Sequence, residues 1–193
     1  MTLEEFLEWE NAQEEKWELV DGYPVPRSDR WYRDPVTGMA GATFRHNRIA
    51  SNILRHLGNR LGDVSCVALP SDQMVRSPSG NARYPDVVVE CGTPANEAKL
   101  AQEPRVLFEV LSPSNTARQQ LKLIADYHLM TTLQHVAFVE QTEPFVLLWT
   151  RNSDGWRAVD YRGLAEVLPL PAIQAELPVA QIYERISFDA PDA

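Results

Sequence analysis

Two acidic residues stand in stretches of the sequence that are otherwise apolar. Asp86 precedes the run Val87–Val89, and Glu109 lies inside the run Val106–Leu111. Short runs rich in β-branched and aromatic residues are typical of strands, and a strand that is apolar on both faces is usually central, so Glu109 is expected to be buried. A buried carboxylate is costly unless a cation, a donor or a proton compensates it. Two such acids on neighbouring strands therefore suggest one shared divalent ion.

Each acid also has a purely structural interpretation. Asp86 can cap a strand or a turn after Pro85. Glu109 can pair with an arginine, because ion pairs that serve stability alone also place acids in protein cores. From these two residues by themselves, both interpretations stay open.

The composition is that of an ordinary globular protein. The 193 residues, of which 44% are hydrophobic and 23% charged, suit one core, so we expect a single domain over 1–193. No apolar run of about 18 residues occurs, and the acidic start Met1–Glu5 does not resemble a signal peptide. Cys66 and Cys91 fall in apolar, strand-like sequence and are expected to be reduced core residues of a cytoplasmic protein.

The charge is unevenly distributed along the chain. A net charge of −9 argues against indiscriminate binding to nucleic acid. Residues 27–83 nevertheless hold nine arginines against four aspartates, between two acidic flanking segments. Such a segment either faces phosphate groups or balances its acidic neighbours, and charge alone slightly favours the second interpretation.

The pattern of apolar and turn residues predicts the elements that position these side chains. Thr2 and Glu5 form a capping box at the start of a first helix, Thr43 can cap a second, and Asp21-Gly22 is a hairpin signal. Residues 28–42 show no period and are expected to be a loop. Helices are expected at about 2–13, 43–62, 115–130 and 178–185. Strands are expected near 16–20, 23–27, 64–69, 72–77, 84–90, 105–113, 136–140, 145–150 and 156–161.

Six short motifs, in order and spacing, resemble the Uma-two family, a large bacterial family of restriction-endonuclease-like proteins in the PD-(D/E)XK nuclease superfamily. The resemblance covers nearly the whole chain and implies an α/β (α+β) fold with a mixed β-sheet core flanked by helices. The motifs are Trp17–Gly22, Met39–Thr43 with His46 and Ile49, Pro70–Asp72, Tyr84–Val89, Glu109–Ser114, and Leu177–Pro178 with Ile182–Tyr183.

The chemistry that this resemblance implies is metal-dependent hydrolysis of a phosphodiester bond in DNA. Position by position, Asp86 matches the aspartate of the PD motif, Glu109 the acid of the (D/E)XK motif, and Glu18 an N-terminal acid. Asp86, Glu109 and the main-chain carbonyl of Val110 would hold Mg²⁺ or Mn²⁺. Hard Mg²⁺ prefers carboxylate oxygens, and it lowers the pKa of a bound water.

The lysine of the family motif is missing. The position two after Glu109 is Leu111, and the helix positions where many family members carry Asp and Lys are Gln119 and Leu123. Lys122 precedes the second of these by one residue, which is about 100° around a helix, but its stem is long and flexible. Lys122 is therefore the candidate to orient or deprotonate the water, and a solvated helix lysine is the competing interpretation.

Two functions follow from these observations. The first is an Mg²⁺-dependent DNA endonuclease with Glu18, Asp86, Glu109 and Lys122 as catalytic residues. The alternative is a catalytically impaired protein that keeps the nuclease fold and serves as a binding or assembly module. The retained acids favour the first function, and the missing lysine and the −9 charge favour the second.

Two surfaces are expected to serve partners. Arg45, Arg48 and Arg55 lie on the helix expected at 43–62 and would contact the DNA backbone, or they would pair with the acidic residues of Glu4–Glu15. A homodimer is expected, because cutting two strands needs two sites. Its interface would be an exposed apolar edge formed by Trp149, Trp156 and Tyr161.

Overall fold

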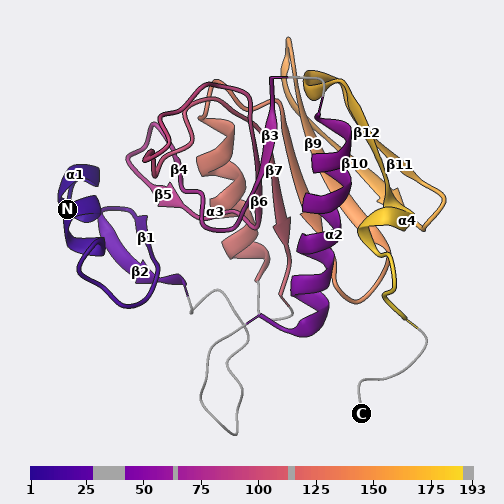
Figure 1. Ribbon diagram of the computed structural model, residues 1–193, viewed down its shortest axis with the longest axis horizontal. Helices are drawn as coiled ribbons and strands as arrows, with labels where there is room; N and C mark the ends of the chain where they lie inside the picture. Colours follow the sequence, from indigo (N-terminus) through magenta and orange to yellow (C-terminus); the bar gives the residue numbers. More distant parts are fainter. Residues whose placement is uncertain (28–41, 63–64, 113–115, 189–193) are drawn as a thin grey trace, which may run out of the picture.

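A six-stranded mixed sheet forms the centre of the fold, as the computed structural model shows (Figure 1). The structure describes residues 1–27, 42–62, 65–112 and 116–188, so most of the expected loop at 28–42, with Arg30 and Arg33, lies outside the described residues. The sheet order is β10-β9-β8-β7-β6-β3. Its strands are β3 (Val67–Pro70), β6 (Val87–Glu90), β7 (Pro104–Val110), β8 (His135–Val139), β9 (Phe145–Asn152) and β10 (Gly155–Arg162).

The strands β7 and β8 are the parallel pair of this sheet, and the other neighbours are antiparallel. A parallel connection needs a crossover, and α3 (Ala117–His128) supplies it. Both central strands are buried on both faces, as the continuous apolar runs predict.

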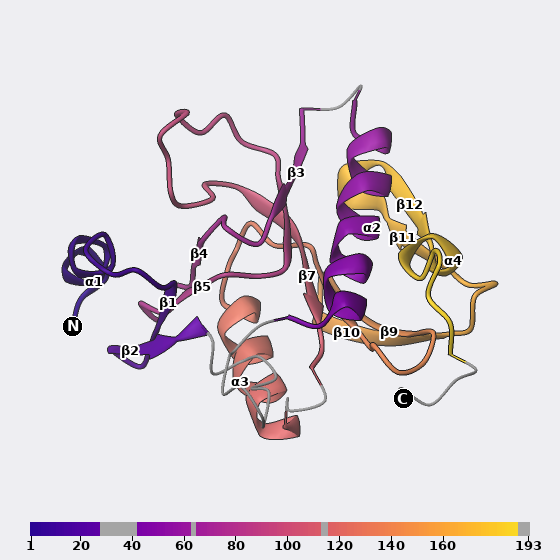
Figure 2. The same cartoon turned by 60° about the horizontal axis from the view of Figure 1, so that its bottom comes forward.

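Helices pack on the two opposite faces of the sheet (Figure 2), and each face has its own apolar layer. On one face lies α2 (Phe44–Arg60), whose stripe packs on Val87 and Phe108, together with β11 (Val167–Leu170), β12 (Ala175–Pro178) and α4 (Val179–Ile182). On the other face, α3 packs on Leu107 and Leu111. The period-2 alternation of β7 thus assigns each of its side chains to one layer.

A smaller four-stranded sheet, in the order β2-β1-β5-β4, lies beside the N-terminal helix. Phe6 of the helix packs with Leu19 and Tyr84. The expected capping box of Thr2 is confirmed, as is the Asp21-Gly22 turn, in which both residues have positive φ. The elements are α1 (Leu3–Glu10), β1 (Trp17–Val20), β2 (Tyr23–Pro26), β4 (Val75–Arg76) and β5 (Ala82–Arg83).

The expected α/β (α+β) class, with a mixed sheet between helices, is confirmed. The hairpin of β11 and β12 was not predicted, because Pro169, Pro171 and Pro178 make that segment read as irregular. Within the described residues, none of the helices has the length and apolar character needed to span a membrane.

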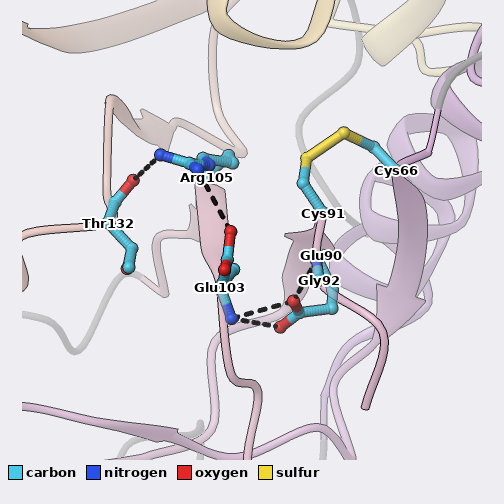
Figure 3. The surroundings of a disulfide bond; sticks show 7 residues. All are labelled: Cys66, Glu90, Cys91, Gly92, Glu103, Arg105 and Thr132. Carbon is cyan, nitrogen blue, oxygen red and sulfur yellow. Dashed lines mark hydrogen bonds and ion pairs between the residues drawn. A yellow bond between two sulfur atoms is a disulfide. The ribbon is translucent and has the colours of Figure 1, made fainter.

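The expectation of two reduced cysteines is wrong, because Cys66 and Cys91 form a disulfide (Figure 3). The β3–β6 register pairs Val67 with Glu90, so the next pair along the two strands is Cys66 and Cys91, whose Cα atoms are 4.0 Å apart. Their separation by 25 positions in the chain hid this pairing at the level of the sequence.

The aromatic edge expected at a dimer interface is partly covered by the chain itself. Trp156 stacks on His128 with ring centroids 4.3 Å apart, and Trp149 meets the same ring edge-on at 5.0 Å. Tyr161 packs against the apolar layer on the α2 side. These three residues are half-buried, and the homodimer stays a prediction.

Candidate active site

The register of β6 and β7 places the two acids identified from the sequence at the same end of these neighbouring strands. Val87 pairs with Phe108 at this end of the β6–β7 ladder, and Asp86 and Glu109 are the residues next to that last pair. Asp86 is 7% exposed and Glu109 is 2% exposed, so both carboxyl groups lie in a largely dry environment.

Three elements converge on the carboxylate of Asp86. The main-chain N–H of Val110 donates to Oδ2 at 2.8 Å. His46, on the first turn of α2, brings Nε2 to 3.3 Å from the same oxygen. Arg27, after β2, has Nη2 at 3.9 Å from Oδ1. Asp86 is thereby oriented by its neighbouring strand and by two cationic or polar side chains from other elements.

The carboxylate of Glu109 faces α3. The hydroxyl of Tyr127, on the last turn of that helix, donates to Oε1 of Glu109. Tyr127 is itself fully buried, in the apolar layer that contains Leu111 and Leu123. Because core packing holds Tyr127 in place, its hydroxyl fixes the position of the carboxylate that accepts this hydrogen bond.

Glu18 is buried and binds two groups next to the site. Its Oε1 accepts the N–H of Tyr84 at 3.0 Å, and its Oε2 accepts Nη1 of Arg83 at 3.3 Å. Arg83 also places Nη2 at 2.6 Å from Oδ2 of Asp126. Burial acts to lower the pKa of Arg83, but the charge of Glu18 and the hydrogen bond to Asp126 outweigh it, so that pKa is raised.

The structure does not bring Lys122 to the acids. Its Nζ lies 3.6 Å from Oδ2 of Asp21, and the two side chains are 56% and 69% exposed. Leu123 takes the buried face of the helix, so one residue of rotation turns Lys122 toward solvent. Gln119 accepts the N–H of Thr116 and completes the capping box of α3. The expectation that Lys122 points toward the carboxylates is therefore corrected.

Arg45 and Arg55, two of the four arginines of α2, are held by the C-terminal part of the chain. Arg45 donates to the carbonyls of Gln141 and Ser187, at 3.2 and 3.4 Å. Arg55 pairs with Glu184 at 2.6 Å, and hydrogen bonds from His56 and Arg55 lower the pKa of that carboxyl. These partners lie in the C-terminal part of the chain and not in the expected Glu4–Glu15 segment. Arg48 is half-buried on the same helix.

A divalent ion is implied by the resemblance, and the donor set at the β6–β7 edge suits it. Among the residues that the structure describes, no group of three or more His, Cys, Asp or Glu side chains could hold a metal ion. Asp86 and Glu109 nevertheless stand next to the last residue pair of β6 and β7, and the N–H of Val110 donates to Asp86. Mg²⁺ keeps several waters and is commonly bound by only one or two carboxylates, so the residues present fit this ion.

Sequence reasoning missed several residues around the acids. His46 formed no ligand motif with the other histidines, and Arg83 seemed part of a basic segment. Asp126 and Tyr127 sit on the same helix as Leu123, and the spacing of four between Leu123 and Tyr127 was a usable signal for one buried face. The contacts to Glu109 and Arg83 required the fold.

Comparisons with known proteins show what this chain is similar to. Residues 3–180 match the family described as "Uma2: Putative restriction endonuclease". Of two proteins from Synechocystis sp., "Uncharacterized protein slr1290" is 28% identical over 188 residues, which is 96% of this chain and 92% of that protein. "Uncharacterized protein sll1609" is 28% identical over 145 residues, which is 73% of this chain and 75% of that protein.

A solved structure shares the fold. It is the crystal structure of a putative nuclease belonging to DUF820 from Anabaena variabilis, which has a TM-score of 0.73 and 16% sequence identity. The match covers 95% of this chain and 97% of that one. The expected restriction-endonuclease-like arrangement, a mixed sheet flanked by helices, is confirmed by this similarity.

Proposed function

The chain belongs to the Uma2 family, and we propose that it is a metal-dependent endonuclease that hydrolyses phosphodiester bonds in DNA. The observation that carries this proposal is the position of two buried acids, Asp86 and Glu109, next to the last residue pair of β6 and β7, with the N–H of Val110 donating to Asp86. The family description and the fold of the solved nuclease relative support it.

The acids and the main chain would share the binding of the metal. Asp86, Glu109 and the carbonyl of Val110 would hold Mg²⁺ or Mn²⁺, which would lower the pKa of a bound water and screen the charge on the phosphate. Asp86 is held in place by the N–H of Val110 and by His46. Tyr127 does the same for Glu109 by donating its hydroxyl.

Backbone phosphates would be held by three arginines of α2, Arg45, Arg48 and Arg55. Arg45 and Arg48 lie on the same helix as His46, which reaches Asp86, so their positive charges stand near the proposed site. A protein of net charge −9 needs such a cationic region to retain a polyanion. Contacts to phosphate carry no sequence information, so DNA binding would weaken with salt uniformly across sequences.

The double change of Arg48 and Arg55 to Ala tests this surface. We expect weaker DNA binding and a shallower dependence of the binding constant on salt, by about one unit of slope per lost phosphate contact. Arg55 also pairs with Glu184, so a lower melting temperature will accompany its loss. Unaltered DNA binding with only the lower melting temperature would make these arginines structural.

A second candidate function is a binding or assembly module that has lost catalysis. Leu111 and Leu123 stand where the family pattern has lysine, and the nearby Lys122 pairs with Asp21. A divalent-ion thermal shift at neutral pH separates the two functions. The nuclease predicts that Mg²⁺ or Mn²⁺ raises the melting temperature through Asp86 and Glu109, and the module predicts no such shift.

Plasmid cleavage tests the proposed activity itself. Supercoiled plasmid incubated with the protein and Mg²⁺ or Mn²⁺ is expected to become nicked or linear, and chelation or Asp86→Ala should abolish the conversion. Asp154→Ala, in the exposed turn between β9 and β10, is the matched control and should cleave like the parent. Equal activity of the parent and Asp86→Ala would overturn the proposal.

A further inference from the structure

We propose that Arg83 is a positioning residue of the candidate site, which sets both metal-binding acids through one buried ionic clamp. The clamp consists of Glu18, Arg83 and Asp126. This inference rests on the proposed function, because it concerns the same Asp86 and Glu109. It assigns Glu18 to the support of the site and gives α3 a charged contact that does not involve Lys122.

Arg83 reaches two different elements at once. Its Nη1 donates to Oε2 of Glu18 on β1 at 3.3 Å, while Nε and Nη2 donate to Oδ2 of Asp126 on α3 at 3.1 and 2.6 Å. All three residues are buried, between 1% and 8% exposed. A guanidinium has a rigid fork of donors, so it can hold the small sheet and the helix in one fixed relation.

The helix end of the clamp lies next to the residue that holds Glu109. Asp126 precedes Tyr127, whose hydroxyl donates to Glu109. Asp126 also accepts Nδ2 of Asn81 at 2.7 Å and Oγ of Ser79 at 3.3 Å on its Oδ1. With Arg83 on the other oxygen, the last turn of α3 is tied to β5 and to the turn before it. Arg83 thereby fixes the position of α3 along and around its axis, and with it the position from which Tyr127 donates to Glu109.

The strand end of the clamp leads to Asp86. Glu18 accepts the N–H of Tyr84 on Oε1, and Tyr84 is two residues before Asp86. The same carboxylate that pairs with Arg83 therefore holds the backbone that enters β6. The guanidinium of Arg83 is thus connected to Asp86 through Glu18 and Tyr84. It is connected to Glu109 through Asp126 and Tyr127.

This arrangement accounts for the uncharged residues on α3. Gln119 closes the helix N-terminus and Leu123 lies in the core, so neither fixes the helix to the acids by charge. Lys122 is solvent-exposed, and an exposed ion pair does little to hold a helix in place. The buried pair of Arg83 and Asp126, one turn further along the helix, supplies that attachment.

Arg83→Lys is the variant of choice, because it keeps the buried charge but cannot span Glu18 and both contacts of Asp126. Arg105→Lys is the matched control, since Arg105 bonds Thr132 and Glu103 at the opposite end of β7. If Arg83→Lys fails to fold, the combined change Glu18→Gln, Arg83→Met and Asp126→Asn removes the clamp without leaving a lone buried charge.

Two readouts are measured on the full chain. The first is the affinity for Mn²⁺ alone, by titration calorimetry, for Arg83→Lys, Tyr127→Phe and the double variant. The second is the ¹⁹F resonance of Tyr127 in protein grown with 3-fluorotyrosine, assigned by its loss in Tyr127→Phe. This resonance reports the hydrogen bond to Glu109 without any metal.

We expect Arg83→Lys to shift the Tyr127 resonance and to lower Mn²⁺ affinity about 10–100-fold, the usual loss for groups that support metal ligands. The same change should cost less affinity in the Tyr127→Phe background than in the parent, because only the route through Glu18 and Tyr84 remains there. Losses that add, or an unmoved Tyr127 resonance, overturn the clamp. A parent that binds no Mn²⁺ overturns the proposed function instead, and the ¹⁹F resonance still decides the clamp.

Discussion

At the scale of single residues, Asp86 and Glu109 were recognisable from the sequence because a charge inside an apolar strand is unusual. Their partners were not recognisable. His46 and Tyr127 are separated from them by 40 and 18 positions, and nothing local marks either as a neighbour of an acid. Lys122 was chosen because lysine was the expected residue type, but a single step around α3 exposes it to solvent. Residue type was thus a weaker guide than the face of the helix.

A buried hydrogen bond of Tyr84, two residues before Asp86, gives the first stability prediction. The hydroxyl of Tyr84 donates to both oxygens of Glu10, at 2.8 and 3.1 Å, and burial together with Glu10 raises the pKa of Tyr84. Tyr84→Phe leaves the buried carboxylate without that donor, so we expect a loss of about 2 kcal/mol in the free energy of unfolding, measured in urea. Tyr23→Phe, at a side chain 73% exposed, should change nothing. Equal stability of both variants would show that the Glu10 contact contributes nothing.

His135 gives the protein a pH dependence of known sign. Burial lowers the pKa of this histidine from 6.5 to about 4. The unfolded chain therefore takes up the proton first, so the stabilisation is complete above pH 6.5 and is lost as the pH falls toward 4. Between pH 7 and pH 5 we expect His135 to account for a loss of about 2 kcal/mol. Urea unfolding of the parent and His135→Gln at both pH values measures it, and parallel losses in the two proteins would contradict it.

At the scale of elements, local signals located most helices and strands because capping and alternation are short-range. Thr2 and Thr43 cap helices as the sequence predicts, and Thr116 caps the third helix. The β11–β12 hairpin was missed because its prolines sit at sheet positions that only an isolated two-stranded pair tolerates. The pairing of strands, and with it the disulfide, depends on contacts between distant segments that periodicity does not report.

The N-terminus of α2 joins this helix to the site, and Thr43→Ala tests that link. The Thr43 hydroxyl accepts the N–H of His46 at 3.1 Å and donates to Gln141, whose amide donates to the carbonyl of Leu111. We expect a loss of about 1–2 kcal/mol in unfolding free energy and weaker Mn²⁺ binding, because His46 loses its anchor. Thr116→Ala, the equivalent cap of α3, should lower stability and leave Mn²⁺ affinity intact. The same Mn²⁺ affinity in both variants would contradict this role of Thr43.

At the scale of the whole molecule, the chain combines an acidic surface with an active-site candidate that is nearly closed to solvent. The contacts of Arg83 and Tyr84 join the four-stranded sheet to α3 and to the segment that enters β6, and the single domain over 1–193 stays a prediction. Charge counts along the sequence drew attention to the arginines of α2, but they could not tell that Arg45 and Arg55 hold the C-terminal segment.

The disulfide is a property of the whole fold, since it ties the edge strand β3 to β6. Cys66 and Cys91 are 25 positions apart in the chain. A disulfide that closes such a loop stabilises a protein by roughly 3 kcal/mol, because it lowers the entropy of the unfolded chain. We expect thiol alkylation of the unfolded protein to label neither cysteine before reduction and both after it, with a lower melting temperature in reductant. Labelling of both cysteines without reduction would show that the bridge is absent.

That Asp86 and Glu109 hold one divalent ion together is tested most directly by calorimetric titration of the parent with Mn²⁺ in the absence of DNA. We predict one Mn²⁺ per chain, and the loss of that binding in Asp86→Asn and, separately, in Glu109→Gln, with Asp154→Ala binding as the parent does. Both changes keep the shape of the side chain and remove its charge, so the loss would belong to the carboxylates. A parent that binds no Mn²⁺, or binding that survives both substitutions, would contradict the shared site.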